Sequence, residues 1–159
     1  MAVPKIHAIC STPQRLSAAG RLTALLVAGA CLAILITASY LTPNPVGHGS
    51  HTGLGLAKCR MMDVANLPCP SCGMTTSFSW FARGNLLASF YVQPMGMLLA
   101  LTAAVVFWGG GYIAVSGKPL HRLLRPIPSR YYVIVPFALA VLGWGWKIFI
   151  HLRGIDGWK

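Results

Sequence analysis

Acidic side chains are nearly absent from this chain. Of its 159 residues only Asp63 and Asp156 carry a carboxylate, and charged residues of both signs make up 9%. The sequence has no paired carboxylates, no glycine-rich phosphate loop and no nucleophile with an adjacent base. It therefore lacks the groups that hydrolases and nucleotide-dependent enzymes use. Both classes of enzyme are disfavoured by what is missing.

Positive charge is in excess, with 13 Lys and Arg and a formal net charge of +11. In a soluble protein this excess would indicate nucleic-acid binding. Here the basic residues lie between and beside long apolar runs, where they meet lipid headgroups and set the orientation of a membrane protein. No basic patch with stacking aromatic residues stands apart from those runs. We therefore expect a lipid bilayer, and no nucleic acid, as a partner.

Three apolar runs dominate a composition that is 55% hydrophobic. Each run is long enough to cross the ~30 Å hydrocarbon core of a bilayer, which takes a helix of about 20 residues. The predicted transmembrane helices cover residues 22–41, 90–115 and 131–150, after a basic N-terminal arm at residues 1–21. Residues 1–159 are expected to form one all-α integral membrane domain. The runs hold almost no polar groups at mid-membrane, so a transporter is disfavoured.

Single residues in these runs lead to further expectations. The second run should begin near Phe90 and bend at Pro94. The glycine triplet that starts at Gly109 should either weaken the helix locally or let a neighbouring helix approach closely, and we favour the packing role. Near the end of the third run, Lys147 is expected to reach outward to the membrane surface, and His151 is expected to lie in the headgroup region.

Two cysteines stand three residues apart in the motif C-P-S-C-G at residues 69–73. Proline suits the first position of a helix, because the N–H that it lacks is not needed there. The motif therefore predicts a short helix over residues 70–82, with Cys69 near its cap and Cys72 in its first turn. Free backbone N–H groups and the helix dipole favour thiolates at such a place.

The predicted short helix has an apolar face, because Met74, Phe78 and Phe81 recur at helical spacing. At 1.5 Å per residue it would be about 20 Å long, too short to cross the membrane. We therefore expect an interfacial or half-inserted helix that carries the CxxC motif. Residues 42–66, which precede the motif, are rich in proline, glycine and histidine and predict a loop.

The basic residues also predict an orientation. Lys and Arg cluster in the short segment of residues 117–130 and beside the first apolar run. Such residues are enriched on the cytoplasmic side of a membrane, which favours a cytoplasmic N-terminus. The cysteine-bearing loop and the C-terminus would then face outward.

A longer pattern surrounds the cysteines between residues 59 and 96. It reads Cys59, the run L-P-C-P-S-C-G-M-T from Leu67 to Thr75, the turn R-G-N at residues 83–85, and Gln93-Pro94. This order and spacing resembles a bacterial membrane family known as domain of unknown function 2752. The family usually has an arginine where this chain has Thr76, and an asparagine where it has Gln93. The resemblance implies a multi-pass protein of the bacterial inner membrane and points to the cysteines, but it implies no reaction.

The cysteines leave three functions open. In the first, the protein is a structural or partner-binding subunit, joined to another membrane protein or to copies of itself. Its CxxC motif is then held rigid by a disulfide from Cys59 to Cys69 or Cys72. In the second, Cys69 and Cys72 are catalytic and cycle between dithiol and disulfide, while Cys59 relays electrons to the pair.

A metal site is the third function left open. Cys59, Cys69, Cys72, His48 and His51 are soft or borderline ligands that suit zinc or copper. The chain lacks the second CxxC or the HxxxH that would make a zinc signature specific. The sequence therefore assigns no cofactor with certainty.

Overall fold

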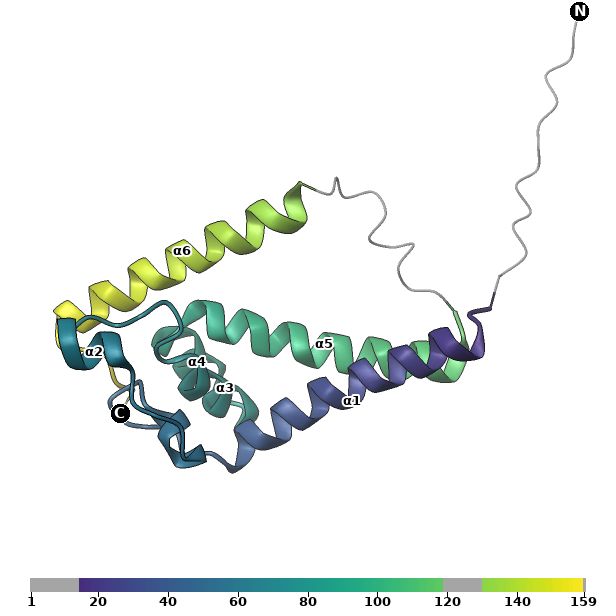
Figure 1. The fold of residues 1–159 in the computed structure, drawn as a ribbon, viewed down its shortest axis with the longest axis horizontal. Helices are drawn as coiled ribbons and strands as arrows, with labels where there is room; N and C mark the ends of the chain where they lie inside the picture. The colour runs from purple at the N-terminus through teal and green to yellow at the C-terminus, as the bar shows by residue number, and fades with distance from the viewer. Residues whose placement is uncertain (1–14, 119–129, 159) are drawn as a thin grey trace, which may run out of the picture.

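The computed structural model describes residues 15–118 and 130–158, and over these residues the chain is helical without strands (Figure 1). This confirms the predicted all-α class with three helices able to cross a membrane. The elements in chain order are α1 (Ala18–Tyr40), the 3-10 helix η1 (Ser50–Leu54), α2 (Arg60–Ala65), α3 (Met74–Ala82), α4 (Leu86–Val92), α5 (Pro94–Ser116) and α6 (Tyr131–Leu152).

The three long helices have the dimensions and the surface of membrane spans. They contain 23, 23 and 22 residues, with mean hydropathies of 2.3, 1.9 and 1.9. At 1.5 Å per residue each is roughly 33–35 Å long, enough to cross a ~30 Å hydrocarbon core. Large apolar side chains on them are exposed, among them Leu26, Trp108 and Leu142 at 65%, 74% and 69%. Such side chains suit a lipid environment, so we treat the chain as a membrane protein.

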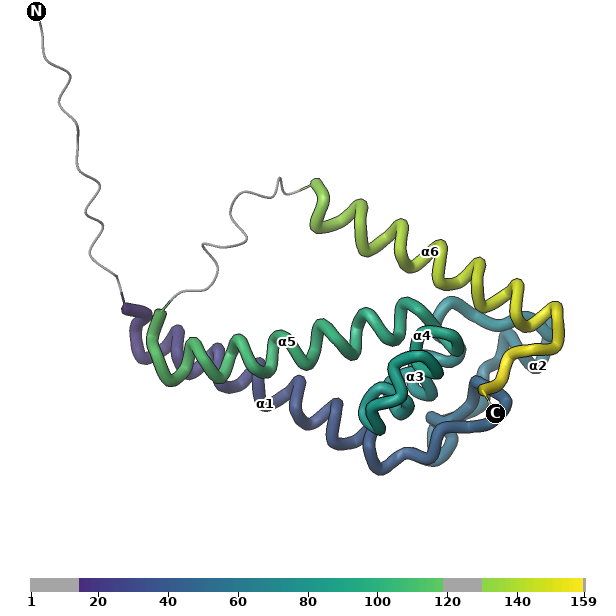
Figure 2. Tube along the Cα trace, turned by 180° about the vertical axis from the view of Figure 1, so that it is seen from behind, coloured from purple at the N-terminus to yellow at the C-terminus, as the bar shows by residue number. Residues whose placement is uncertain are grey.

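α1 and α5 pack closely against each other, and Gly110 lies at their contact. A Cβ atom at Gly110 would stand 2.9 Å from both the Ala24 carbonyl oxygen and the Ala28 Cβ. The predicted packing role of the glycine triplet is therefore confirmed at this residue. At the far end of the pair, the Arg21 guanidinium donates hydrogen bonds to the last carbonyls of α5, including that of Ala114 at 2.7 Å. The start of α1 and the end of α5 thus lie together (Figure 2).

The second span begins later than predicted, because the chain breaks at Pro94 instead of bending there. Phe90 belongs to the separate helix α4, and Gln93 between the two helices is extended, with φ −160° and ψ 100°. Proline has no N–H to continue a helix and disfavours the helical conformation in the residue before it. It does suit the first turn of a new helix, which is where Pro94 lies in α5.

The face of α3 that packs against the protein is polar, while the predicted apolar face is partly exposed. Thr76, Ser77 and Ser79 are fully buried, whereas Met74 and Phe78 are half-exposed. The Ser77 hydroxyl donates to the Ser89 carbonyl at 2.8 Å, and the Ser89 hydroxyl donates to the Ser77 carbonyl at the same distance. Small hydroxyl side chains let membrane helices approach closely and satisfy each other's polar groups. This explains how α3 and α4 lie against each other beside α5.

The C-terminal end of α6 closes over the region of the cysteines. The indole N–H of Trp144 donates to the Pro68 carbonyl at 3.0 Å, and that of Trp146 donates to the Tyr91 carbonyl at 2.8 Å. The end of α6 and the tail after it lie beside α2 and the loop that follows α1 (Figure 1). The cysteine motif therefore lies at the end of the molecule opposite the start of α1.

Candidate functional site

Three cysteine thiols converge at this end of the molecule. Cys59 precedes α2, and Cys69 and Cys72 lie in the turn before α3. The three Sγ atoms all lie within 4.8 Å of one another, and those of Cys69 and Cys72 are 3.2 Å apart. All three thiols are free. The sequence motif and its upstream cysteine thus form one cluster in space.

The helix start predicted at Pro70 is wrong, because the cysteine motif folds as a turn. The Cys72 N–H donates to the Cys69 carbonyl at 2.9 Å, and α3 begins only at Met74. Gly73 ends the turn with φ 87°, a left-handed conformation that favours glycine. A Cβ atom there would lie 2.9 Å from the Gly47 carbonyl oxygen. The turn is therefore held against the loop that follows α1.

The short helix α2 was not predicted, since residues 42–66 were expected to form a loop. It starts directly after Cys59, whose carbonyl accepts the N–H groups of Met62 and Asp63, both at 3.1 Å. It ends at Asn66, which takes the left-handed conformation with φ 51°. The apolar residues of α2 show too few helical repeats to reveal a helix of this length. Its effect is to point Cys59 back at the CxxC turn.

The surroundings of Cys59 and Cys72 give the two thiols different pKa values. The backbone N–H of Met62 faces the Cys59 thiol and lowers its pKa from the ordinary 9.0 to about 7. Burial, followed by the hydrogen bond with Cys69, raises the pKa of Cys72 to about 12. Cys72 is 5% exposed, whereas Cys59 is partly exposed. A thiolate near neutral pH therefore forms at Cys59, which is partly exposed, and not at the buried Cys72.

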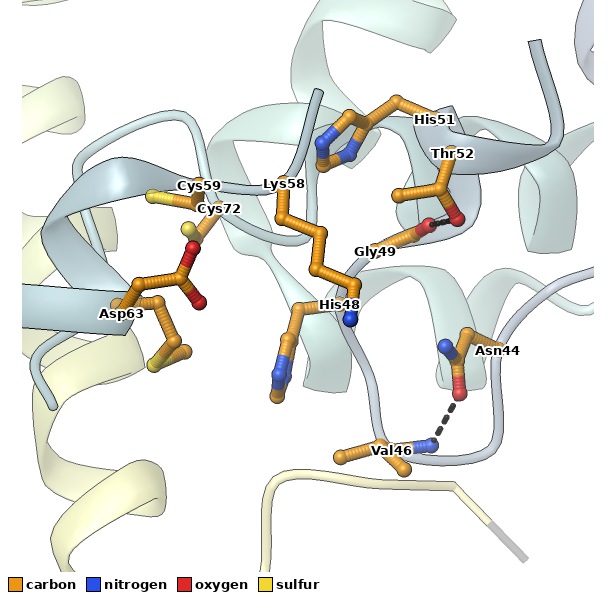
Figure 3. Close-up of a pocket in the computed structure, with 11 residues that line it drawn as sticks. Asn44, Val46, His48, Gly49, His51, Thr52, Lys58, Cys59, Asp63 and Cys72 are labelled. Carbon is orange, nitrogen blue, oxygen red and sulfur yellow. Dashed lines mark hydrogen bonds between the residues drawn. The ribbon is translucent and has the colours of Figure 1, made fainter. Parts of the chain in front are cut away.

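A cavity of about 260 Å³ opens beside Cys59 and Cys72 (Figure 3). His48 and His51 line it, as do Lys58 and Asp63. The nitrogen atoms of the two histidines lie outside the sulfur cluster, and His51 Nε2 bonds to the Ala57 carbonyl at 3.1 Å. Of the five predicted metal ligands, the structure thus brings together the three cysteines. These lie close enough to hold a metal ion.

A buried charged group lies next to this cavity and contradicts one prediction. Lys147 is fully buried on α6 and does not reach outward, because its Nζ lies 3.1 Å from Asp156 Oδ1 and donates to the Gly47 carbonyl at 3.2 Å. His151, one turn further along α6, bonds within the protein, its Nδ1 to Asp156 and its Nε2 to the Asn66 carbonyl at 3.1 Å. The tail after α6 thus folds back and supplies a carboxylate to two basic side chains.

Sequence reasoning missed this group, although two signals for it exist. Lys147 and His151 are four residues apart near the end of an apolar helix, which places them on one face. A charged residue in a membrane helix commonly has a partner and a function. With two acids in the chain, Asp156 was one of two candidates for that partner.

His48 connects the charged group to the cysteine cavity. Its ring meets that of His151 edge to face, with the centroids 6.4 Å apart. Burial, and next the nearby positive charge of Lys147, lowers the pKa of His48, while Asp156 opposes this effect. The ring is therefore neutral at pH 7 and able to accept a proton.

Comparison with known proteins agrees with the pattern around the cysteines. Residues 59–107 match the family model described as "Protein of unknown function (DUF2752)". The matched stretch runs from Cys59 through α3 and α4 and past the middle of α5, so it includes the whole sulfur cluster. Neither a search of curated proteins nor a search of solved structures finds a match to the chain.

Proposed function

For a membrane protein whose residues 59–107 belong to the DUF2752 family, we propose thiol–disulfide exchange as the function. Cys69 and Cys72 are the working dithiol, and Cys59 is the thiol that exchanges with a partner. The observation that carries this proposal is the 3.2 Å distance between the Cys69 and Cys72 sulfur atoms, with Cys59 Sγ within 4.8 Å of both. The disulfide bond can then be transferred from each sulfur atom to a neighbouring one within the cluster.

The sulfur distance favours redox chemistry over a metal site. A tetrahedral ion with metal–sulfur bonds of 2.3 Å holds its sulfur atoms about 3.8 Å apart. The Cys69 and Cys72 sulfur atoms are closer than this, at the separation of two thiols that share a hydrogen bond. Small movements of the turn would bring them to bonding distance.

The exchange takes three steps, in which the co-reactant is a disulfide of a partner protein. The Cys59 thiolate attacks this disulfide, forms a mixed disulfide and releases one partner thiolate. The Cys69 thiolate then attacks the Cys59 sulfur and releases the second partner thiolate. Finally the Cys72 thiolate attacks the Cys69 sulfur and frees Cys59. Two electrons pass to the partner, the protons lost by Cys69 and Cys72 balance those gained by the partner's thiolates, and the reverse sequence oxidises a partner.

The environments of the thiols suit this order. The first nucleophile must be accessible and ionised near neutral pH, which describes Cys59. The last one can be buried, because it reacts only inside the cluster, which describes Cys72. The scaffold role and the metal site, which the sequence also left open, are the alternatives to thiol–disulfide exchange. An experiment can distinguish the three.

The test is a redox titration of the full-length protein in detergent or in lipid nanodiscs. Thiols are counted after equilibration in glutathione buffers of graded potential, and zinc and copper are measured by elemental analysis. We expect a two-electron transition of Cys69 and Cys72 within the range of about −120 to −270 mV. Cys31→Ser, in α1 and away from the cluster, is the control and should titrate like the wild type.

Two outcomes would overturn the proposal. Stoichiometric zinc or copper that leaves only when the cysteines are replaced would establish a metal site. A disulfide that persists throughout the range, or thiols that never oxidise, would leave a scaffold. A Cys59→Ser variant that exchanges with oxidised glutathione as fast as the wild type would remove the relay step.

A further inference from the structure

We infer that Gln93 and Trp144 are positioning residues, which hold the backbone on either side of Cys69. The inference rests on the proposed exchange reaction, in which Cys69 is the middle thiol. Its thiolate attacks the sulfur of Cys59 and releases the partner's second thiolate, and its own sulfur is then attacked by Cys72. Both steps need the Cys69 sulfur to stay within reach of the other two. Neither positioning residue belongs to the cysteine motif.

Two prolines flank Cys69, and the carbonyl group of each accepts a hydrogen bond from a side chain. The Trp144 indole N–H donates to the Pro68 carbonyl at 3.0 Å, and Gln93 Nε2 donates to the Pro70 carbonyl at 3.1 Å. The Pro68 side chain is itself fully buried. Proline fixes its own φ and restricts the conformation of the residue before it. The backbone at Cys69 is therefore limited by the prolines and held from both sides.

Both donors come from the place where α4, α5 and α6 meet. Gln93 joins α4 to α5, and its carbonyl accepts the Met97 N–H of α5 at 3.1 Å. Trp144 follows Gly143 on α6, where an added Cβ atom would stand 3.1 Å from the Met95 Cβ. This part of α6 thus lies close against the start of α5. The two side chains therefore extend toward the cysteine turn from one framework of packed helices.

The burial of Gln93 indicates a role beyond packing. Its side chain is 0% exposed, and its Oε1 atom has no hydrogen-bond partner within the described part of the chain. A buried polar atom without a partner destabilises the folded protein, and an apolar side chain of similar shape would avoid this cost. An amide at this position is explained if the cysteines need its bond to the Pro70 carbonyl.

Cys59 is held less firmly than Cys69. It precedes α2, and none of the six residues of this helix, all of which the structure describes, is buried. The Cys69 sulfur, by contrast, lies 3.2 Å from that of Cys72 in the turn that the two side chains hold. Misplacing a reacting group by about 1 Å can slow a reaction about 100-fold. Loss of either positioning residue should therefore slow the steps at Cys69 and leave the first step, at Cys59, unchanged.

The test follows one turnover of the reduced full-length protein with oxidised glutathione. Samples are quenched with acid, and mass spectrometry separates the mixed disulfide at Cys59 from the internal disulfides. Gln93→Met keeps the approximate shape of the side chain but removes both the donor and the unpaired oxygen. We expect the mixed disulfide to form at the wild-type rate but to be resolved about 10- to 100-fold more slowly. The unfolding temperature should stay within about 4 °C of the wild-type value.

Trp144→Phe tests the second hydrogen bond, and Trp146→Phe is its matched control. Both variants lose an indole from α6, but the Trp146 indole donates to the Tyr91 carbonyl of α4 at 2.8 Å and not to the cysteine turn. We expect slower resolution of the mixed disulfide in Trp144→Phe and wild-type resolution in Trp146→Phe. A general loosening of α6 would instead slow both variants equally and contradict the positioning role.

Two further results would overturn the inference. Resolution at the wild-type rate in both Gln93→Met and Trp144→Phe would show that the Cys69 sulfur keeps its place without these bonds. Parallel losses in formation rate, resolution rate and unfolding temperature would show that the two residues only stabilise the fold. If the wild type itself forms no mixed disulfide at Cys59, or never resolves it, the exchange function fails, whatever the variants do.

Discussion

At the scale of single residues, the cysteine cluster owes its chemistry to unequal surroundings of similar thiols. The Met62 N–H lowers the pKa of Cys59 to about 7, so its thiolate forms as the pH rises through neutrality. We expect iodoacetamide to modify one cysteine of the reduced protein at a rate that rises between about pH 6 and pH 8 and then levels off. Cys72, with its pKa raised to about 12, should stay unmodified over that range.

Peptide mapping of the alkylated protein measures this prediction directly. Cys59→Ser should remove the early phase of modification, and Cys31→Ser should leave it in place. A phase at Cys59 with a midpoint near 9, the ordinary value for a cysteine, would show that the start of α2 has no influence on the thiol.

A second prediction at this scale concerns the buried ion pair. Lys147→Met would break the ion pair of the buried Asp156 and leave it only its bond to His151, and breaking a buried pair commonly costs about 3–5 kcal/mol. We expect a lower unfolding temperature and faster proteolysis of the C-terminal tail. In the double variant Lys147→Met/Asp156→Asn the lone charge is gone, so it should be more stable than Lys147→Met alone. A double variant that loses the sum of both single effects would contradict the pairing.

How far single residues could be predicted from the sequence depended on whether their partners were close in the chain. Cys69 and Cys72 are near neighbours, and the resemblance pattern joined Cys59 to them, so all three candidates meet in space. The partner of Lys147 lies beyond the end of its helix, in a tail whose fold no periodicity reveals. Without a known partner, Lys147 was expected to reach outward to the membrane surface. This prediction was wrong because Lys147 pairs with Asp156 inside the protein.

At the scale of elements, the long helices were predictable and the short ones were not. Length and hydropathy alone identify α1, α5 and α6. By contrast, α2 and α3 have six and nine residues, and local hydrogen bonds and turns decide where they begin. Pro70 looked like a helix start, but the chain makes a turn there and starts α3 at Met74.

The contact between α1 and α5 gives a prediction with an internal control. Gly110→Ala places a Cβ against the backbone and side chain of α1, which should cost about 1–3 kcal/mol. Gly111→Ala, one residue on, meets no atom within 4 Å and should be neutral or stabilising by up to about 1 kcal/mol. Thermal unfolding in one detergent compares the two variants. Equal effects would mean that the helices do not touch at Gly110.

At the scale of the whole molecule, the fold divides into two ends. Residues between α1 and α5, including η1, α2, α3 and α4, gather at one end with the cysteine cluster and the C-terminal tail (Figure 2). The start of α1 and the end of α5 lie at the other, where Arg21 caps α5. Because α3 and α4 are too short to cross a bilayer, the cysteine cluster and the tail must share one side of the membrane.

The last prediction is the side of the membrane on which the cysteine cluster lies, because this side determines the redox compartment to which the thiols are exposed. The distribution of Lys and Arg favours a cytoplasmic start of α1, so the cysteine cluster and Trp158 should lie outside, where disulfides persist. A membrane-impermeant maleimide added to intact cells should label Cys59 but not Lys118→Cys, at the exposed end of α5. Permeabilised cells should show both sites labelled. Labelling of Lys118→Cys alone in intact cells would reverse the orientation, and the cluster would then work against the reducing glutathione pool of the cytoplasm.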